Sequence, residues 1–346
     1  MQGSIWSVEI ASGLAVELVS GPKYYSSPNY SPDGNWLIYT ADDHGRSIQL
    51  EVLNIATGET RELTDGTHVY ADPKFSPDGS RIAYVSTEPA GFFNVYLRDI
   101  ADGSWAGAAV AVTSDNNYGR DRLYFGAQDI HITPAWFPDG EELLLVSNRD
   151  VPLGSGNVFR VPAREDGFAD REGVLIEQTL YRSQPDVSID GRRFVFSSTR
   201  ASADQFNNLY VQPTAGGEPY KLTFFDHDAF HPRWSPDGEW IAYYGKAADA
   251  STQVFVVRSD GSEPPKQITT LPFGAGAGLR WHPSGNSILC FSNNGVVSTC
   301  VQEGANFGKS VFLTDQGIGP ERSKLALSWD GIMIAFNKPV PTADER

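Results

Sequence analysis

The 346-residue chain has only two cysteines, and no apolar stretch approaches the ~18 residues needed to span a bilayer. Its first residues, MQGSIWSVEIASG, lack a basic start and an apolar run, so no signal peptide is visible, although a removed signal or a domain cut from a longer chain would look the same. Cys290 and Cys300 flank FSNNGVVST and could face each other across a hairpin, but two cysteines do not make a disulfide framework. We therefore expect no membrane insertion and no disulfide-dependent fold.

Positive charge is also scarce. The chain has 27 lysines and arginines against 43 aspartates and glutamates, a net charge of -16. An acidic surface repels a phosphate backbone, which argues against nucleic acid as a partner. Hydrophobic residues make up 40% of the chain and aromatic residues 12%, so the composition supports a large core.

One turn motif recurs along the whole chain. It reads YSPDG, FSPDG, WFPDG, VSIDG, WSPDG, WHPSG and LSWDG, and its copies end at Gly34, Gly79, Gly140, Gly191, Gly238, Gly285 and Gly331. The spacings between these glycines are 45, 61, 51, 47, 47 and 46 residues, a period typical of repeat architectures. In each full motif, proline presets φ for a type I turn and glycine accepts a positive φ at its exit.

Apolar residues alternate on both sides of each turn, which predicts a hairpin of two half-buried strands. A third strand follows, as in NVYLRDI at 94–100 or QVFVVRS at 253–259, and a fourth often closes on Leu-Thr, as in RELT at 61–64. Four antiparallel strands in ~46 residues are one blade of a propeller. The copies therefore predict an all-β, seven-bladed β-propeller of four-stranded antiparallel blades.

The two ends of the chain complement each other. SIWSVEI and LAVELVS, before the first hairpin, resemble a third and a fourth strand, whereas the last hairpin ends at IMIAFNK without them. We expect a shared blade with two strands from each terminus, built from residues 1–20 and 321–338, which leaves no open sheet edge. The chain is then a single domain over 1–346, with an insertion loop at 113–133 before the third hairpin.

The repeats resemble the TolB-like propeller repeat, whose hallmark is Ser-Pro-Asp-Gly followed by an Ile-Ala-Tyr strand. Here the hallmark reads SPDGSRIAYVS at 76–86 and SPDGEWIAYYG at 235–245. The segment DNNYGRDRLYFGAQDIHITPAW at 115–136 is similar to the propeller part of large bacterial amidohydrolases. The resemblance departs from the family in two ways, because TolB has six blades and carries an N-terminal α/β domain for which this chain has no room.

The longer and more varied loops, between second and third strands and between blades, share one face, which we call the variable loop face; SNRDVPLGSGN and SSTRASADQFNN are examples. We expect a monomeric binding scaffold for a protein, peptide or carbohydrate ligand, acting through this face. The resemblance implies a periplasmic or secreted location. It also leaves two alternatives open, a metal-dependent hydrolase or lyase with its site at the channel mouth, and the propeller domain of a larger hydrolase. A nucleophilic enzyme finds little support, because the sequence has no Gly-x-Ser-x-Gly elbow and no phosphate-binding glycine loop.

Polar residues recur where the innermost strand of each blade begins. The rows seven and nine positions before the turn glycine share a parity, and the apolar row four positions before it has the other, so we expect the polar rows to face the channel. The predicted ligand-binding ring at the channel mouth consists of Asp72, His131, Arg182, Gln184, His231, Arg322 and Lys324. A water-filled channel lined by satisfied polar groups is the alternative interpretation of this ring.

Histidines and carboxylates gather in the connections between blades, the densest run being DHDAFH at 226–231. Converging imidazoles and carboxylates could hold a divalent metal ion, although no spacing matches a zinc signature. The tentative ligands are His131, His227, His231 and Asp72. No cofactor is certain from the sequence.

Overall fold

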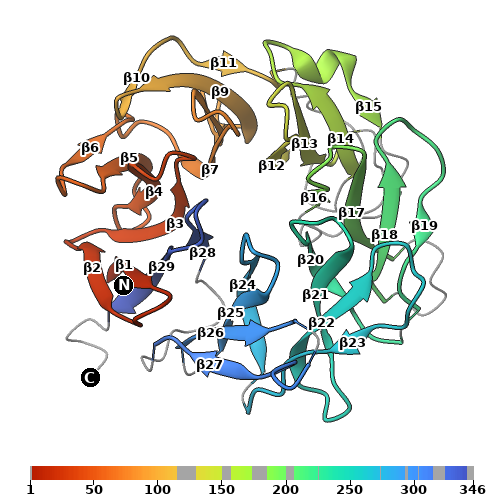
Figure 1. The fold of residues 1–346 in the computed structure, drawn as a ribbon. Coiled ribbons are helices and arrows are strands. Elements are labelled where there is room, and N and C mark those ends of the chain that lie inside the picture. The colour runs from red at the N-terminus through yellow and green to blue at the C-terminus, as the bar shows by residue number, and fades with distance from the viewer. Residues whose placement is uncertain are drawn as a thin grey trace.

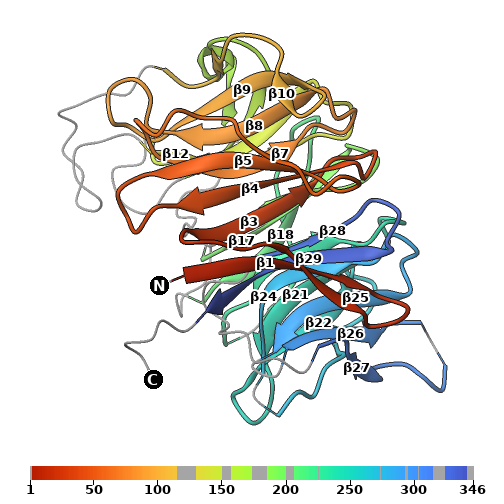
Figure 2. The ribbon, with the colours of Figure 1, turned by 90° about the vertical axis from the view of Figure 1, so that its left-hand side faces the viewer.

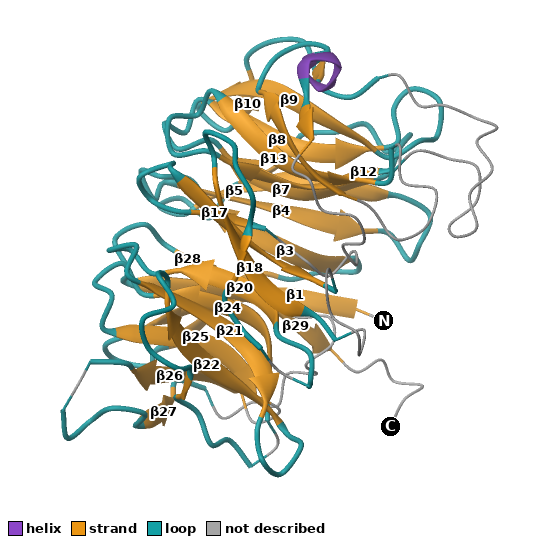
Figure 3. Ribbon diagram, turned by 90° about the vertical axis from the view of Figure 1, so that its right-hand side faces the viewer, coloured by secondary structure: helices purple, strands orange, loops and turns teal. Residues whose placement is uncertain are grey.

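The computed structural model describes residues 2–114, 130–149, 157–173, 185–199, 206–224, 226–272, 274–292, 295–302, 304–314 and 324–340. These residues form β-strands and one short 3-10 helix, so the chain is an all-β protein (Figure 3). No described helix is long and apolar enough to cross a membrane. Most of the predicted insertion loop 113–133 lies outside the described residues.

Four of the sheets have four strands in chain order. They are β12 (His131–Trp136), β13 (Glu142–Ser147), β14 (Asn157–Pro162) and β15 (Glu172–Gly173); β16 (Asp186–Val187), β17 (Arg193–Ser198), β18 (Asn208–Pro213) and β19 (Tyr220–Lys221); β20 (Phe230–Trp234), β21 (Trp240–Lys246), β22 (Thr252–Arg258) and β23 (Lys266–Gln267); and β24 (Ala275–Trp281), β25 (Ser287–Ser292), β26 (Gly295–Cys300) and β27 (Ser310–Phe312). The 3-10 helix η1 (Gly167–Asp170) precedes β15. These strands fall where the repeats predict them.

Two sheets are larger. One contains β7 (Tyr70–Phe75), β8 (Arg81–Ser86) and β9 (Asn94–Ala101), with β10 (Ser104–Trp105) and β11 (Val110–Ala111) both paired to β9. The other contains β3 (Tyr24–Tyr30), β4 (Trp36–Asp42), β5 (Ile48–Asn54) and β6 (Thr60–Glu62) together with β28 (Leu325–Leu327), β29 (Met333–Val340), β1 (Gln2–Glu9) and β2 (Ala15–Val19). A single parallel pair, Gly3 with Tyr24, joins its two halves.

Strands from the two ends of the chain lie in this one sheet (Figure 2). β1 pairs with β29 along its whole length, from Gln2 opposite Val340 to Glu9 opposite Met333. β28 and β2 flank this pair on its two sides. The expectation that N- and C-terminal strands share a sheet is confirmed.

The sheets form a ring (Figure 1). The strands nearest its middle, which we call the innermost strands, are β3, β7, β12, β16, β20, β24 and β28. β3 contacts β7, β7 contacts β12, and the series continues through β16, β20, β24 and β28, which contacts β3 again. The apolar core lies between neighbouring sheets. In one cluster, for example, Ala83 and Leu97 of one sheet lie against Leu143 and Phe159 of the next.

The recurring turns have the predicted geometry. The glycine that ends each motif has a φ between 68° and 77°. In the second copy, Ser76 Oγ donates to Asp78 Oδ1 at 2.6 Å and accepts from the backbone N–H of Arg81 at 3.0 Å. The motif thus has a structural role, which is to form the turn that closes each hairpin.

The cysteines do not face each other. Cys290 of β25 stands opposite Val297, whereas Cys300 of β26 stands opposite Ser287, and both thiols are free. Burial raises the pKa of Cys290 to about 12, so this thiol stays protonated. The possible Cys290–Cys300 disulfide is therefore absent, because the register places Cys300 opposite Ser287, three residues along β25 from Cys290.

Candidate functional site

The innermost strands β3, β7, β12, β20 and β24 each contain an irregularity of register close to their start. There the residue seven positions before the turn glycine has a left-handed backbone, with Ser27 at φ 54°, Asp72 at 48°, Thr133 at 53°, His231 at 53° and Gly278 at 68°. In β3, β7, β12 and β20 the bulge places one extra residue on the strand, so side-chain alternation is reversed across it. In β24 the irregularity spans two extra residues.

This reversal changes which row faces the core. Tyr25, nine positions before its glycine, lies in the same cluster as Tyr30, four positions before it, and Tyr70 and Phe75 are paired in the same way. His131 belongs to the same row, is fully buried and lies edge-to-face on Phe168 with ring centroids 4.6 Å apart. The parity expected from the sequence, with these two rows on opposite sides, is corrected here because the count runs through the bulge.

The row five positions before each turn glycine has the opposite orientation. Its charged members are Lys74 of β7, Asp186 of β16, Arg233 of β20 and Arg280 of β24. The charges of Arg280, Arg233 and Lys324 all act on the Lys74 amine, although they come from three other innermost strands or their starts. These strands lie around the middle of the ring (Figure 1), and the charges of their side chains act on one another there.

We refer to Asp72, Lys74, Asp186, Arg233, Arg280 and Lys324 as the axial cluster. It contains four cationic side chains and two carboxylates. Lys324 forms an ion pair with Asp72, joining the start of β28 to β7 across the ring. Within the described part of the chain, Lys74 and Arg280 form no ion pair.

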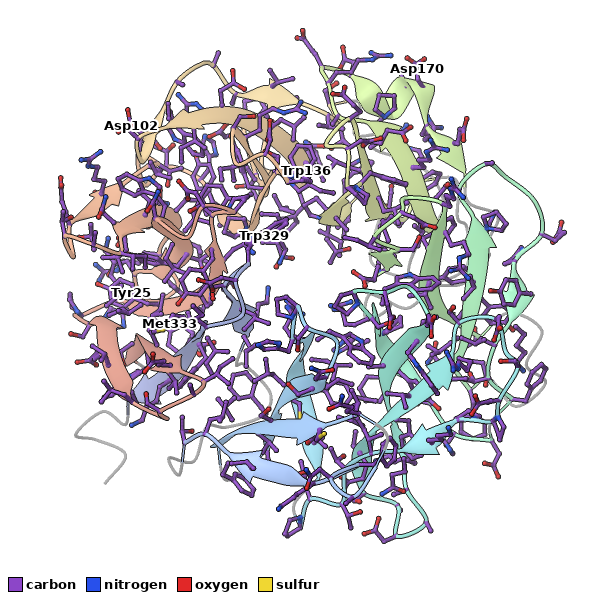
Figure 4. The ribbon with its side chains drawn as sticks, viewed as in Figure 1. Tyr25, Asp102, Trp136, Asp170, Trp329 and Met333 are labelled. Atoms are coloured by element: carbon purple, nitrogen blue, oxygen red, sulfur yellow. The ribbon has the colours of Figure 1, made fainter. Side chains whose placement is uncertain are left out.

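Hydrogen bonds between sheets hold the row in place. The indole N–H of Trp136 donates to the carbonyl of Lys74 at 3.1 Å, that of Trp234 to the carbonyl of Asp186 at 3.1 Å, and that of Trp281 to the carbonyl of Arg233 at 3.0 Å. In each case the tryptophan of one sheet fixes the backbone of the preceding innermost strand. Figure 4 shows Trp136 on the inner side of the ring, whereas Asp102 and Asp170 lie at its outer rim.

The electrostatics of the cluster are determined first by burial and then by the neighbouring charges. Burial lowers the pKa of Lys74 to about 7, and the charges of Arg280, Lys324 and Arg233 reinforce this against the opposing Asp72. Burial and the neighbouring Arg233 lower the pKa of Arg280 to about 10. The pKa of Asp72 is lowered, because Lys324 and Lys74 outweigh the effect of its burial. A weakly basic amine beside two guanidinium groups is thus the chemical signature of this site.

Asp186 shows the opposite balance. Burial raises the pKa of its carboxyl group, although Arg233, Arg280 and a hydrogen bond from the backbone N–H of Trp234 at 2.8 Å all oppose the shift. This carboxylate therefore offsets the arginines only in part, and positive charge remains in excess along the axis.

The predicted ring is brought together only in part. Asp72 and Lys324 are paired, whereas His131 lies in the core and the ring of His231 contacts Phe230 and Tyr244. Arg182, Gln184 and Arg322 lie outside the described residues. Among the side chains that the structure describes, which include His131, His227, His231 and Asp72, no group of three or more metal ligands is assembled.

The sequence does contain a signal for the charged residues of the axial cluster that were not predicted as site residues. Position five before each glycine carries Lys74, Asp186, Arg233 and Arg280, four charged residues directly preceding the apolar position that begins the turn motif. Neighbouring residues of a strand point to opposite faces, so this charged row must face away from the core. No bulge intervenes between the two positions, which makes this inference safer than one from the rows further upstream.

No protein-family model matches the sequence. Over 110 residues, or 31% of the chain, it is 29% identical to the Bacillus subtilis (strain 168) protein described as "Uncharacterized peptidase YuxL". The matched segment spans only 16% of that relative's length.

Two solved structures cover nearly the whole chain. A putative TolB from Agrobacterium tumefaciens is 19% identical with a TM-score of 0.56, covering 99% of both chains. An oligogalacturonate lyase in complex with manganese is 14% identical with a TM-score of 0.65, covering 100% of this chain and 98% of that one. Likeness at this level of identity shows the fold alone, and the chain has the TolB-like β-propeller fold.

Proposed function

We propose that this TolB-like β-propeller is a non-catalytic binding scaffold for an acidic ligand, a protein, peptide or glycan whose carboxylates enter the axial cluster. The observation that carries the proposal is the excess of cationic over anionic side chains along the axis of a chain with a net charge of -16. A carboxylate would supply the missing counter-charge to Lys74 and Arg280 through charge-assisted hydrogen bonds. Arg182, Gln184 and Arg322, from equivalent strand starts, remain candidate contributors.

The scaffold in this proposal is a seven-bladed, monomeric propeller over 1–346, and the half of the shared sheet made of β1, β2, β28 and β29 is its seventh blade. Residues 1–20 and 321–338 build that blade, and the loops of the variable face surround the ligand. The closed series of contacts between innermost strands supports this arrangement. A rigid ring suits binding because its side chains are held in position before the ligand arrives.

The test compares a short oligogalacturonate and an oligoglutamate peptide with neutral maltotriose, by calorimetric titration at low ionic strength. We expect the acidic probes to bind and the neutral sugar not to bind. Arg280→Gln should weaken binding by about tenfold, because a hydrogen bond to a charged group contributes about 1.5–3 kcal/mol. Added salt should weaken binding as well.

Arg258→Gln is the matched control. Arg258 is an arginine outside the axial cluster: its guanidinium lies 4.3 Å from the Trp240 ring centroid, and it pairs with Glu239 and Glu263. Equal losses in the two variants, or equal binding of maltotriose, would rule out the axial cluster as the ligand site.

A lyase is the second candidate, favoured by the pKa of Lys74 near 7 and by the likeness to oligogalacturonate lyase. The neutral amine would remove a proton from the carbon bearing a carboxylate, the bond from the next carbon to its oxygen would break, and the leaving alkoxide would take a proton from water. The ultraviolet absorbance of an unsaturated product tests this reaction. Loss of turnover in Lys74→Met with retained binding would replace the scaffold with the enzyme.

A metal-dependent hydrolase or lyase, or the propeller part of a larger hydrolase, remains a further proposal. The relative with a peptidase name supports the latter. Metal analysis of the purified protein tests the former, because stoichiometric, tightly held transition metal is expected only for a metalloenzyme. A periplasmic or secreted location is proposed from the likeness to TolB structures and is tested by cell fractionation.

A further inference from the structure

A cavity lies on the flank of the ring, and none of its lining residues belongs to the axial cluster. It has a volume of about 300 Å³ and opens between the sheet of both termini and β27 of the neighbouring sheet. The turn between β1 and β2 borders it, and Gly13 of that turn stands close to the backbone carbonyl of Leu313. We call this cavity the lateral pocket.

Three of the residues that line it are aromatic. Trp6 and Phe336 are cross-strand partners on β1 and β29, and they face Phe312 and Leu313 at the end of β27. Phe336 is only 3% exposed, whereas Phe312 is 42% exposed. The pocket therefore has a buried floor and one apolar wall open to solvent, the combination expected of a ligand site.

One cation stands in this apolar setting. Lys338 lines the pocket with its amine 4.9 Å from the Trp6 ring centroid, and among the described residues it forms no ion pair. The indole N–H of Trp6 already donates to Ser4 Oγ at 2.9 Å, so the ring offers only its apolar surface. The polar requirement of a ligand would thus be met by Lys338.

We propose that the lateral pocket binds a small aromatic carboxylate, with its ring against Trp6 and Phe312 and its carboxylate on the Lys338 amine. The size is appropriate, since an apolar cavity of ~150 Å³ admits benzene and this one has room for a ring with a short acidic arm. Glu17, the exposed cross-strand neighbour of Trp6, carries a negative charge that should limit the affinity for an acid. The proposal does not depend on the axial cluster.

The test uses phenylacetate, with phenylacetamide as the neutral match and acetate as the match without a ring, in saturation-transfer NMR and calorimetric titrations. We expect phenylacetate to bind about fivefold tighter than phenylacetamide, and acetate not to bind. Lys338→Met should remove the preference for the acid. Glu17→Gln should strengthen binding of phenylacetate without changing that of phenylacetamide.

Lys266→Met is the matched control, because Lys266 also places its amine over an indole, 5.1 Å from the Trp240 centroid, outside the pocket. It should leave binding unchanged. Phe312→Ser provides a second, exposed variant that should weaken both ring-containing probes. No binding of phenylacetate, equal affinity for the acid and the amide, or binding that is unchanged in both Lys338→Met and Phe312→Ser would each overturn the proposal.

Discussion

At the residue scale, the pKa of Lys74 reflects the surroundings of the axis. Its pKa falls to about 7 because burial disfavours the charged form and nearby cations add to the effect. A base whose pKa is lower in the folded state binds its proton more weakly there than in the unfolded chain. It therefore destabilises the folded state at every pH at which the unfolded chain is protonated. Stability should therefore rise with pH from about 7 up to the unfolded value of 10.5.

Replacing Lys74 with methionine should remove this pH dependence. Methionine keeps the length of the side chain without its charge, so we expect the variant to gain stability relative to the parent at pH 7 and below. The advantage should shrink as the pH rises towards 10.5, where the parent amine is neutral in both states. Urea unfolding of both proteins across this range measures the effect, and parallel profiles would contradict it.

At the element scale, the bulge in the innermost strands decides what the sequence could and could not predict. The hairpins were predictable because proline and glycine act locally, at the turns themselves. The orientation of His131 was not, because a left-handed residue between it and the turn reverses the alternation, and alternation assumes a regular strand. The orientation of Lys74 and Arg280 was predictable, because it follows by one step of alternation from the apolar residue next to each of them. The ion pair of Lys324 with Asp72 was not predictable from the strand pattern, because it forms only when the closed ring brings β28 and β7 together.

Thr133 allows the bulge to be tested, since a β-branched residue with a φ of 53° is strained and its hydroxyl is buried without a hydrogen-bond partner among the described residues. Thr133→Gly should be more stable than Thr133→Ala by about 1 kcal/mol, because glycine accepts a left-handed backbone. At Thr252, the first residue of β22, the order should be reversed because glycine weakens an ordinary strand. Thermal unfolding of the four variants checks both orders.

At the scale of the whole molecule, closure depends on the strand pair made by the two ends. β1 and β29 are matched along eight residues, and β28 of the same sheet contacts β3 to complete the ring. Each sheet shares its core with its neighbours, so opening one junction exposes two apolar faces. Stability should therefore be a property of the ring and not of single sheets.

Removing residues 1–19 tests this dependence. The truncation deletes β1 and β2 and leaves β29 with an unpaired edge, so we expect a lower unfolding midpoint and association that increases with protein concentration. Unfolding curves combined with light scattering at several concentrations measure both effects. A truncated protein as stable and monomeric as the parent would argue against closure by this sheet.

The pairing of β1 with β29 also determines when this sheet can form during synthesis of the chain. Met333–Val340 leaves the ribosome more than three hundred residues after Gln2–Glu9, so β1 must wait for its partner while all of the intervening strands are made. Throughout that interval the nascent chain carries an unsatisfied strand edge, the kind of surface that chaperones shield. This sheet can therefore close only after Met333–Val340 has been made, and slow translation of the intervening chain lengthens the period of risk.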